Sequence, residues 1–190
     1  LDLATVYSVI ANNGIKNEIK DITKIENYDG KVIFDINKID DASEQVLDER
    51  ISFLLIDVLK DNIARSPAFG SNSMLVIPDH PEVAVKTGTS NDLKDNLTIG
   101  FNQDFLVAVW VGNNDGSPMS RIASGITGAA PIWNKIMRVL INDESAKEWP
   151  IPDGLTNKEC FGRNEWFLEE NQLNCPKILE PAASTEVLVE

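Results

Sequence analysis

The stretch VAVKTGTSNDLKDNLTIGFNQDFLVAVWV, residues 83–111, decides the fold. It holds three apolar runs, at residues 83–90, 97–101 and 105–111, which polar or turn-forming residues separate. This pattern predicts three β-strands in quick succession, with a tight connection between the last two. The third run, from Phe105 to Val111, is apolar on both faces and favours an interior strand covered on both sides.

Helices are expected on either side of these strands, where apolar residues recur at helical spacing. The first covers residues 1–13, and the second runs from Ser43, a possible N-cap, to about Asn62. The third covers residues 125–142. Its expected packing face is Ala129, Ile132, Trp133, Ile136, Met137 and Leu140.

Between the first two helices, Asp29-Gly30 separates two β-prone runs and predicts a hairpin. Residues 36–43 and 65–82 are expected to be loops, because polar residues fill the first and prolines punctuate the second. Helices and closely spaced strands together predict an α+β fold.

Composition excludes several classes of function. The 190 residues carry 30 acidic and 17 basic side chains, for a net charge of −13. Binding to nucleic acid or to anionic lipid relies on clustered basic residues, so neither is expected. The longest apolar run, residues 105–111, is far shorter than the ~18–20 residues of a membrane-spanning helix. The chain begins at Leu1 without a basic segment, and we expect it to be a piece of a longer protein.

The acidic charge is concentrated near the C-terminus. Residues 143–190 hold 11 acidic and 4 basic residues, with prolines throughout, and predict an acidic appendage to a domain at residues 1–142. Cys160 and Cys175 lie in this segment. They could form a disulfide in an oxidising compartment or remain two free thiols. Because the chain has one His, a zinc site of Cys and His alone would lack a fourth ligand.

The segment Lys86-Thr87-Gly88-Thr89-Ser90 is the strongest candidate for a functional site. Lys86 is a cation at the end of an apolar strand, and two Thr hydroxyls can donate to a carboxylate or carbonyl oxygen. Gly88 lacks a Cβ, so a ligand can approach the backbone closely. If the strand lies at a sheet edge, an extended peptide could pair with it. The same tetrapeptide could also be a strand end that only enters a turn.

His80 is the one residue that could complete a Ser-His-Asp triad. It lies in a loop between Pro78 and Pro81, and we expect it to be a solvated loop residue. Trp110 and Trp133 are expected in the core and not as ligand-stacking residues.

The neighbouring sequence strengthens the site interpretation. Residues 83–119, followed by ASGITGAAPIWNKIM, resemble the transpeptidase domain of class A penicillin-binding proteins, which polymerise and cross-link peptidoglycan. LDLATVYSVIANNG, the hairpin near residue 30 and Arg65-Ser-Pro-Ala-Phe-Gly resemble further parts of that domain, in order, over residues 1–142. The resemblance implies an antiparallel five-stranded sheet with helices on both faces and the K-T-G strand at one edge.

The resemblance also implies roles for individual residues. Lys86 would bind the substrate carboxylate and hold the proton network, and Thr87 and Thr89 would hydrogen-bond that carboxylate. The Thr89 backbone N–H would serve in the oxyanion hole, while Gly88 permits close approach. Ser90, Asn91 and residues 115–119 would border the cleft. The implied partners are peptidoglycan stem peptides and β-lactams, with no metal or organic cofactor.

Two of the family's three motifs are absent from this chain. No Ser begins S-x-x-K, which holds the nucleophile, and none begins S-x-N. The resemblance therefore implies the C-terminal portion of a transpeptidase domain, inactive alone, from a protein anchored at the extracytoplasmic face of the membrane. Such a location favours the Cys160–Cys175 disulfide. It also implies that residues 105–111 lose a neighbouring strand and become an exposed edge that self-associates.

Two other hypotheses remain open. The chain could be a non-catalytic module of the cell envelope that holds a peptide carboxylate on the K-T-G-T strand. It could also be an unrelated α+β domain whose K-T-G-T-S segment contacts a phosphate, although no glycine-rich loop or helix start surrounds that segment.

Overall fold

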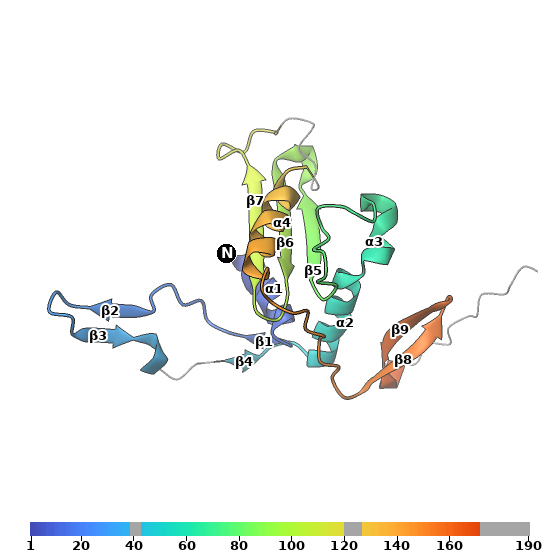
Figure 1. The fold of residues 1–190 in the computed structure, drawn as a ribbon, viewed down its shortest axis with the longest axis horizontal. Coiled ribbons are helices and arrows are strands. Elements are labelled where there is room, and N and C mark those ends of the chain that lie inside the picture. The colour runs from blue at the N-terminus through green and yellow to red at the C-terminus, as the bar shows by residue number, and fades with distance from the viewer. Residues whose placement is uncertain (39–42, 120–126, 172–190) are drawn as a thin grey trace, which may run out of the picture. The chain divides into compact units, whose positions relative to one another are not determined.

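The computed structural model describes residues 1–38, 43–119 and 127–171, and it divides the chain into two compact units, Leu1–Pro150 and Ile151–Glu190 (Figure 1). Residues 143–150, which the sequence pattern assigned to the appendage, belong to the first unit. The Trp149 side chain is buried, and its indole Nε1 donates to the Glu82 carbonyl oxygen at 2.8 Å. None of the helices in the described ranges is long and apolar enough to cross a membrane.

The first unit is built on an antiparallel sheet of three strands in the order β5-β6-β7. These strands are β5 (Ala84–Thr89), β6 (Asp95–Phe101) and β7 (Leu106–Gly112). Asn102 makes the tight turn before β7, because its Oδ1 accepts from the backbone N–H groups of Asp104 and Phe105. The three predicted strands are therefore confirmed.

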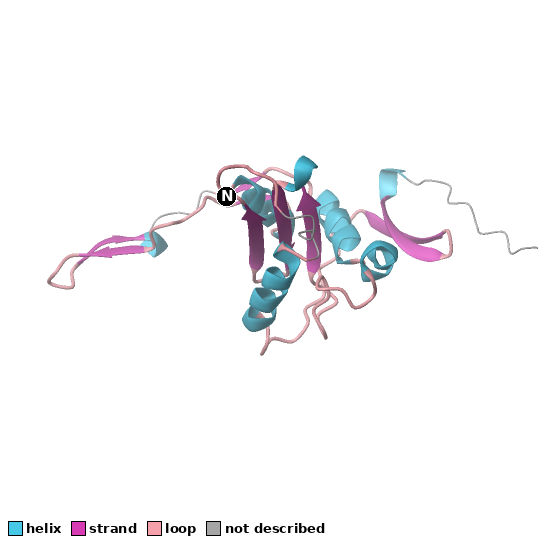
Figure 2. Ribbon diagram, turned by 90° about the horizontal axis from the view of Figure 1, so that it is seen from above, coloured by secondary structure: helices cyan, strands magenta, loops and turns pink. Residues whose placement is uncertain are grey.

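Helices cover both faces of this sheet (Figure 2). On one face, α1 (Asp2–Ala11) places the ring of Tyr7 6.4 Å from that of Phe101. On the other, α4 (Ala129–Leu140) packs Trp133 against Gly100. Successive residues of a strand point to opposite faces, so Phe101 contacts the helix on one face and Gly100 contacts the helix on the other. The α+β class predicted from the sequence is confirmed.

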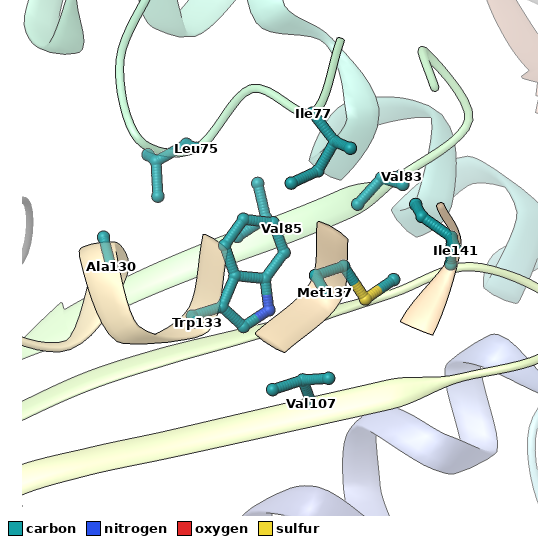
Figure 3. Packing of buried hydrophobic residues seen from close by; sticks show 9 residues of the cluster. All are labelled: Leu75, Ile77, Val83, Val85, Val107, Ala130, Trp133, Met137 and Ile141. Atoms are coloured by element: carbon teal, nitrogen blue, oxygen red, sulfur yellow. The ribbon is translucent and has the colours of Figure 1, made fainter. Parts of the chain in front are cut away.

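The main core lies between α4 and the sheet. Trp133 and Met137 are fully buried and meet Val85 of β5 and Val107 of β7 (Figure 3). Gly100 is required under the indole, because a Cβ there would lie 2.7 Å from Trp133 Cε2. The other residues of the cluster lie in the loop before β5, immediately before that strand, within α4 and just after α4. These residues are Leu75, Ile77, Val83, Ala130 and Ile141.

The packing face of α4 differs from the expected one. The buried residues of the helix are Ala129, Ala130, Trp133, Asn134 and Met137, whereas the expected Ile132, Ile136 and Leu140 are 46%, 42% and 39% exposed. The polar residue Asn134 lies on the buried face, where its Nδ2 donates to the carbonyls of Met74 and Val76 at 3.0 Å each. These bonds satisfy the buried amide, which the apolar pattern alone did not place on this face. Residues 120–126, where the helix was expected to start, lie outside the described residues.

The second helix also begins later than expected. α2 covers Glu49–Lys60, and its N-cap is Asp48, whose Oδ1 accepts from the Arg50 backbone N–H at 2.8 Å. The expected cap, Ser43, precedes a short strand, β4 (Glu44–Gln45), which pairs with β1 (Ile15–Lys16). Pairing satisfies this backbone in an extended form, so the helix cannot start there.

A further helix, α3 (Asn62–Phe69), replaces the first part of the expected loop at 65–82. It contains Pro67, which has no N–H to donate to the carbonyl of Ile63. The hydroxyl of Ser66 donates to that carbonyl instead, at 2.9 Å. The prolines therefore misled the sequence reading, because a local side chain makes the missing hydrogen bond.

β7 is less covered than its composition suggested. Val107 is buried, but Trp110 is 47% exposed, so the expectation of an interior strand covered on both sides is wrong for this chain. β7 lies at one end of the sheet order, as the edge prediction required. Trp110 is therefore not the core residue that was expected, whereas Trp133 is.

The remaining elements are local hairpins. In the first unit, β2 (Lys24–Glu26) and β3 (Val32–Asp35) form the predicted hairpin, followed by a 3-10 turn at Ile36–Lys38. The second unit holds an antiparallel pair, β8 (Leu155–Cys160) and β9 (Arg163–Leu168), and a 3-10 turn at Glu169–Asn171, which the appendage interpretation missed.

Candidate functional site

The K-T-G-T segment occupies the edge strand β5, whose outer side pairs with no strand among the described residues. The Val85 carbonyl accepts from Arg65 Nη1 at 3.3 Å, so the backbone of Val85 points away from β6. Backbone groups alternate in direction along an antiparallel pair. The N–H and C=O of Thr87 and Thr89 therefore face the same open edge, as do those of Val85.

The two ends of the strand confirm this alternation. Ser90 donates its backbone N–H to the Asp95 carbonyl at 2.9 Å, so Ser90 faces β6 and Thr89 faces outward. Lys86 Nζ donates to the Thr87 carbonyl at 2.6 Å, so this carbonyl also points away from β6. The N–H groups of Thr87 and Thr89 and the Thr89 carbonyl therefore face the edge where a peptide-like ligand could pair, whereas the Thr87 carbonyl accepts from Lys86.

Gly88 leaves room above the strand. A Cβ built at this position would meet Leu97 Cβ alone, at 3.8 Å, which is an ordinary contact. Gly88 is therefore not required by packing, unlike Gly100 in the neighbouring strand. Its exposed backbone allows the close approach that the sequence suggested.

The side chain of Thr89 accepts a hydrogen bond from Asn96 of the neighbouring strand. The two residues are direct partners in the β5–β6 register, and Asn96 Nδ2 donates to Thr89 Oγ1 at 3.4 Å. Asn96 is fully buried, and its Oδ1 accepts from the Ala129 backbone N–H at 2.7 Å. Asn96 was not among the predicted site residues, although a polar residue within an apolar strand is a signal for such a role.

The turn after β5 is fixed by Ser90 and Asp95. Ser90 Oγ accepts from the Asp95 backbone N–H at 2.8 Å, and Trp110 Nε1 donates to Asp95 Oδ1 at 2.9 Å. The hydrogen bond from Trp110, followed by that from Ser90, holds the pKa of Asp95 below its ordinary value. Asp95 therefore stays ionised beside the end of the K-T-G-T strand.

The residues expected to border the site lie near this turn. Asn91 begins the 3-10 turn Asn91–Leu93, and the Met119 backbone N–H donates to the Leu93 carbonyl at 3.0 Å. This bond brings the end of the 115–119 loop to the β5–β6 connection. Within that loop, hydrogen bonds from the side chain and then the backbone of Ser117 lower the pKa of Asp115.

Arg65 anchors the outer edge of β5, a role that sequence reasoning missed. Besides Val85, its guanidinium donates to the carbonyls of Leu59 and Lys60 at 3.1 Å each, at the end of α2. Burial lowers the pKa of this guanidinium. Beside it lies a cavity of about 230 Å³. Its walls are Val58, Leu59, Asp61, Arg65, Phe69, Leu75, Val85, Lys86 and Thr87.

His80 is not the solvated loop residue that was expected. Its side chain is 9% exposed, and Nδ1 lies 2.8 Å from Oε1 of Glu82, whose side chain is 5% exposed. Trp149, which is also buried, donates its indole N–H to the Glu82 carbonyl in the same region. A structural pairing with Glu82 accounts for the position of His80. Cys160 is buried at the end of β8, and Cys175 lies outside the described residues, so their pairing stays a prediction.

No family model matches the chain. Solved structures show the fold to be that of the penicillin-binding proteins. Penicillin-binding protein 1A from Haemophilus influenzae matches 88% of this chain and 31% of its own, with a TM-score of 0.75 and 20% identity. PonA1 from Mycobacterium tuberculosis, in complex with penicillin V, matches 78% of this chain and 40% of its own, with a TM-score of 0.65 and 23% identity.

Among curated proteins, the chain is similar to penicillin-binding protein 1A of Neisseria lactamica. The two are 28% identical over 181 residues, which is 94% of this chain and 22% of the relative. The resemblance to class A penicillin-binding proteins is confirmed. The chain spans about a fifth of the length of that relative.

Proposed function

We propose that this chain is part of a serine-type D,D-transpeptidase that cross-links peptidoglycan stem peptides through a Ser acyl-enzyme. The observation that carries this proposal is the open edge of β5, which presents the K-T-G-T segment to a peptide-like ligand. The similarity to penicillin-binding protein 1A supports it over nearly the whole chain. In this proposal the first unit, residues 1–150, supplies the transpeptidase fold, and the acidic appendage predicted from residue 143 begins instead at Ile151.

The chemistry would divide between this chain and an upstream segment. A Ser hydroxyl from an S-x-x-K motif attacks the carbonyl carbon, its O–C bond forms, and the C–N bond of the peptide or β-lactam breaks. The departing nitrogen takes up the proton that the Ser loses. Neither S-x-x-K nor S-x-N occurs in the 190 residues, so this chain alone should form no acyl-enzyme.

The residues of β5 would bind and stabilise the reacting groups. The Thr89 backbone N–H, which faces the open edge, would donate to the oxyanion, and one such donor is worth ~3 kcal/mol in the transition state. Lys86 and the hydroxyls of Thr87 and Thr89 would bind the ligand carboxylate. Gly88, with open space above it, would let the ligand backbone approach.

Two further features belong to this proposal. The PonA1 structure contains penicillin V, and we expect the longer protein that includes this chain to be acylated by penicillins. A class A protein would act at the extracytoplasmic face of the membrane, held by an anchor outside this chain. The exposed edge of β7 would then be completed by strands from upstream sequence, and in the isolated chain it would self-associate.

The coding sequence upstream of Leu1 tests the enzymatic proposal against its alternative. The transpeptidase proposal requires an open frame with S-x-x-K followed by S-x-N. A frame that starts near Leu1 would contradict it and favour the non-catalytic carboxylate-binding module. That module still predicts binding of a peptide carboxylate to the 190-residue chain, lost in Lys86→Met, which chemical-shift titration can measure.

A further inference from the structure

The amide side chain of Asn96 joins three elements behind the candidate site. It projects from β6, it is fully buried, and its Oδ1 accepts from the Ala129 N–H at the start of α4 at 2.7 Å. The N-cap of α4 is Gly128, which has no side chain to cap the helix. Asn96 therefore supplies the cap for α4 from a strand 33 residues earlier in the chain.

This cap fixes which way the amide of Asn96 faces. Because Oδ1 receives the Ala129 N–H, the Nδ2 group is the end that faces Thr89, and it lies 3.4 Å from Thr89 Oγ1. The register supports the contact independently. Thr89 and Asn96 are opposite each other at a pair that is not hydrogen-bonded through the backbone, where opposing side chains are closest.

The direction of this hydrogen bond decides what the Thr89 hydroxyl can do. A hydroxyl has one proton to donate and two lone pairs that accept. Since Nδ2 can only donate, Thr89 Oγ1 accepts from Asn96, and its own proton remains available to a ligand because Thr89 is exposed. An acceptor at position 96 would instead draw that proton inward.

We infer that Asn96 is a positioning residue that turns the Thr89 hydroxyl into a donor toward the anionic carboxylate of a ligand on β5. This inference rests on the proposed function and adds a residue outside the K-T-G-T segment to the specificity for carboxylate ligands. Asn96 acts through Thr89, and it serves a second purpose as the cap of α4. The ligand class is an acyl donor that carries a free carboxylate next to the scissile amide.

The substitution Asn96→Asp tests the inference in the longer protein that includes the upstream motifs. The aspartate can keep the Ala129 N–H bond, but it presents an acceptor to Thr89. Acylation rates are measured with penicillin V and with its methyl ester, which lacks the anionic carboxylate. We expect the rate with penicillin V to fall about tenfold or more, the effect of losing one hydrogen bond to a charged group. The rate with the ester should change less than about threefold.

Charge repulsion by the new aspartate must be separated from the effect on Thr89. In the Thr89→Val background the hydroxyl is absent, so Asn96→Asp should no longer change the ratio of the two rates. A change that persists there would arise from repulsion and would overturn the inference. If Asn96→Asp fails to fold, Asn96→Ala replaces it. That variant leaves the hydroxyl without direction, and we expect a smaller loss confined to penicillin V.

A matched control is Asn134→Asp, another buried amide, which donates to the carbonyls of Met74 and Val76 and does not contact Thr89. It should lower the melting temperature without changing the ratio of the two rates. No acylation of the wild-type longer protein by either compound would reject the proposed function and, with it, this inference. Acylation of the wild type with an unchanged ratio in Asn96→Asp would reject the inference alone.

Discussion

Two glycines of the sheet should differ in how much stability the same substitution to alanine costs. Gly100 lies beneath Trp133, and a Cβ there would be 2.7 Å from the indole Cε2 and 2.9 Å from the Ala84 carbonyl oxygen. Gly88 lies one strand away, where a Cβ would meet one carbon at 3.8 Å. Gly100→Ala should therefore destabilise the first unit, and Gly88→Ala should leave its stability nearly unchanged.

The expected magnitude follows from the rigidity of the two neighbours of Gly100. The Trp133 side chain is fully buried and the Ala84 oxygen belongs to the backbone of β5, so neither can move aside freely. Overpacking of this kind costs about 1–3 kcal/mol in the free energy of unfolding. At about 2–4 °C per kcal/mol for a unit of this size, Gly100→Ala should lower the melting temperature by several degrees. Gly88→Ala should stay within about 0.5 kcal/mol of the wild type.

Thermal and urea unfolding of the two variants measures the difference. In a Trp133→Phe background the contact with the indole is reduced, so the additional cost of Gly100→Ala should fall, whereas the clash with Ala84 remains. Equal stability of Gly100→Ala and Gly88→Ala would refute the close packing of Trp133 of α4 against Gly100. In the longer protein, Gly88→Ala should still slow acylation, which would separate its role in ligand approach from stability.

Three further results are expected. Hydrogen bonds from Trp110 and Ser90 lower the pKa of Asp95 in the folded state. As the pH falls, Asp95 is therefore protonated in the unfolded chain before it is protonated in the folded one, and its contribution to stability is lost below about pH 4. Unfolding curves between about pH 7 and about pH 3 should show a weaker pH dependence in Trp110→Phe, and an identical one would contradict the assignment. A lysine at position 65 cannot bridge the same carbonyls, so Arg65→Lys should lower the free energy of unfolding by about 1–3 kcal/mol and speed amide exchange in β5. Unchanged amide exchange would exclude the anchoring role of Arg65. Ala108 is the register partner of Ile99, and its backbone N–H and C=O face outward from β7. Ala108→Pro should therefore reduce self-association, measured by light scattering, without breaking the β6–β7 ladder. A wild-type chain that stays monomeric at high concentration would contradict self-association through β7.

The sequence predicted the parts of the fold that depend on local pattern. Strand runs between residues 83 and 111 and the Asp29-Gly30 hairpin follow from periodicity and turn chemistry, and the structure confirms them. The start of α2 could not be predicted, because pairing between β1 and β4 decides it from residues far apart in the sequence. The helix at Pro67 depends on one hydroxyl of Ser66, which no propensity reveals.

The candidate site was predicted in part for the same reason. K-T-G-T is a contiguous motif, so its strand and its position at the edge followed from the sequence and the family resemblance. Arg65, Asn96 and the buried His80–Glu82 pair act across long sequence separations. Their partners become known only from the packing of α3, α4 and the residue 143–150 segment. Burial of the His80–Glu82 pair was missed because one contact at this place, from Trp149 to the Glu82 carbonyl, spans 67 residues of sequence.

We propose that β5 forms one wall of a penicillin-reactive transpeptidase site. The most direct test of this proposal is the intact mass of the longer protein after incubation with penicillin V, compared among the wild type, Lys86→Ala and Lys135→Ala. Lys135 is an exposed cation on α4 and serves as the control. We expect one covalent adduct per wild-type and Lys135→Ala chain, and acylation that is slower by about tenfold or more in Lys86→Ala, since a lost hydrogen bond to a charged group is worth about 1.5–3 kcal/mol. No adduct on the wild type, or equal rates in the two variants, would contradict it.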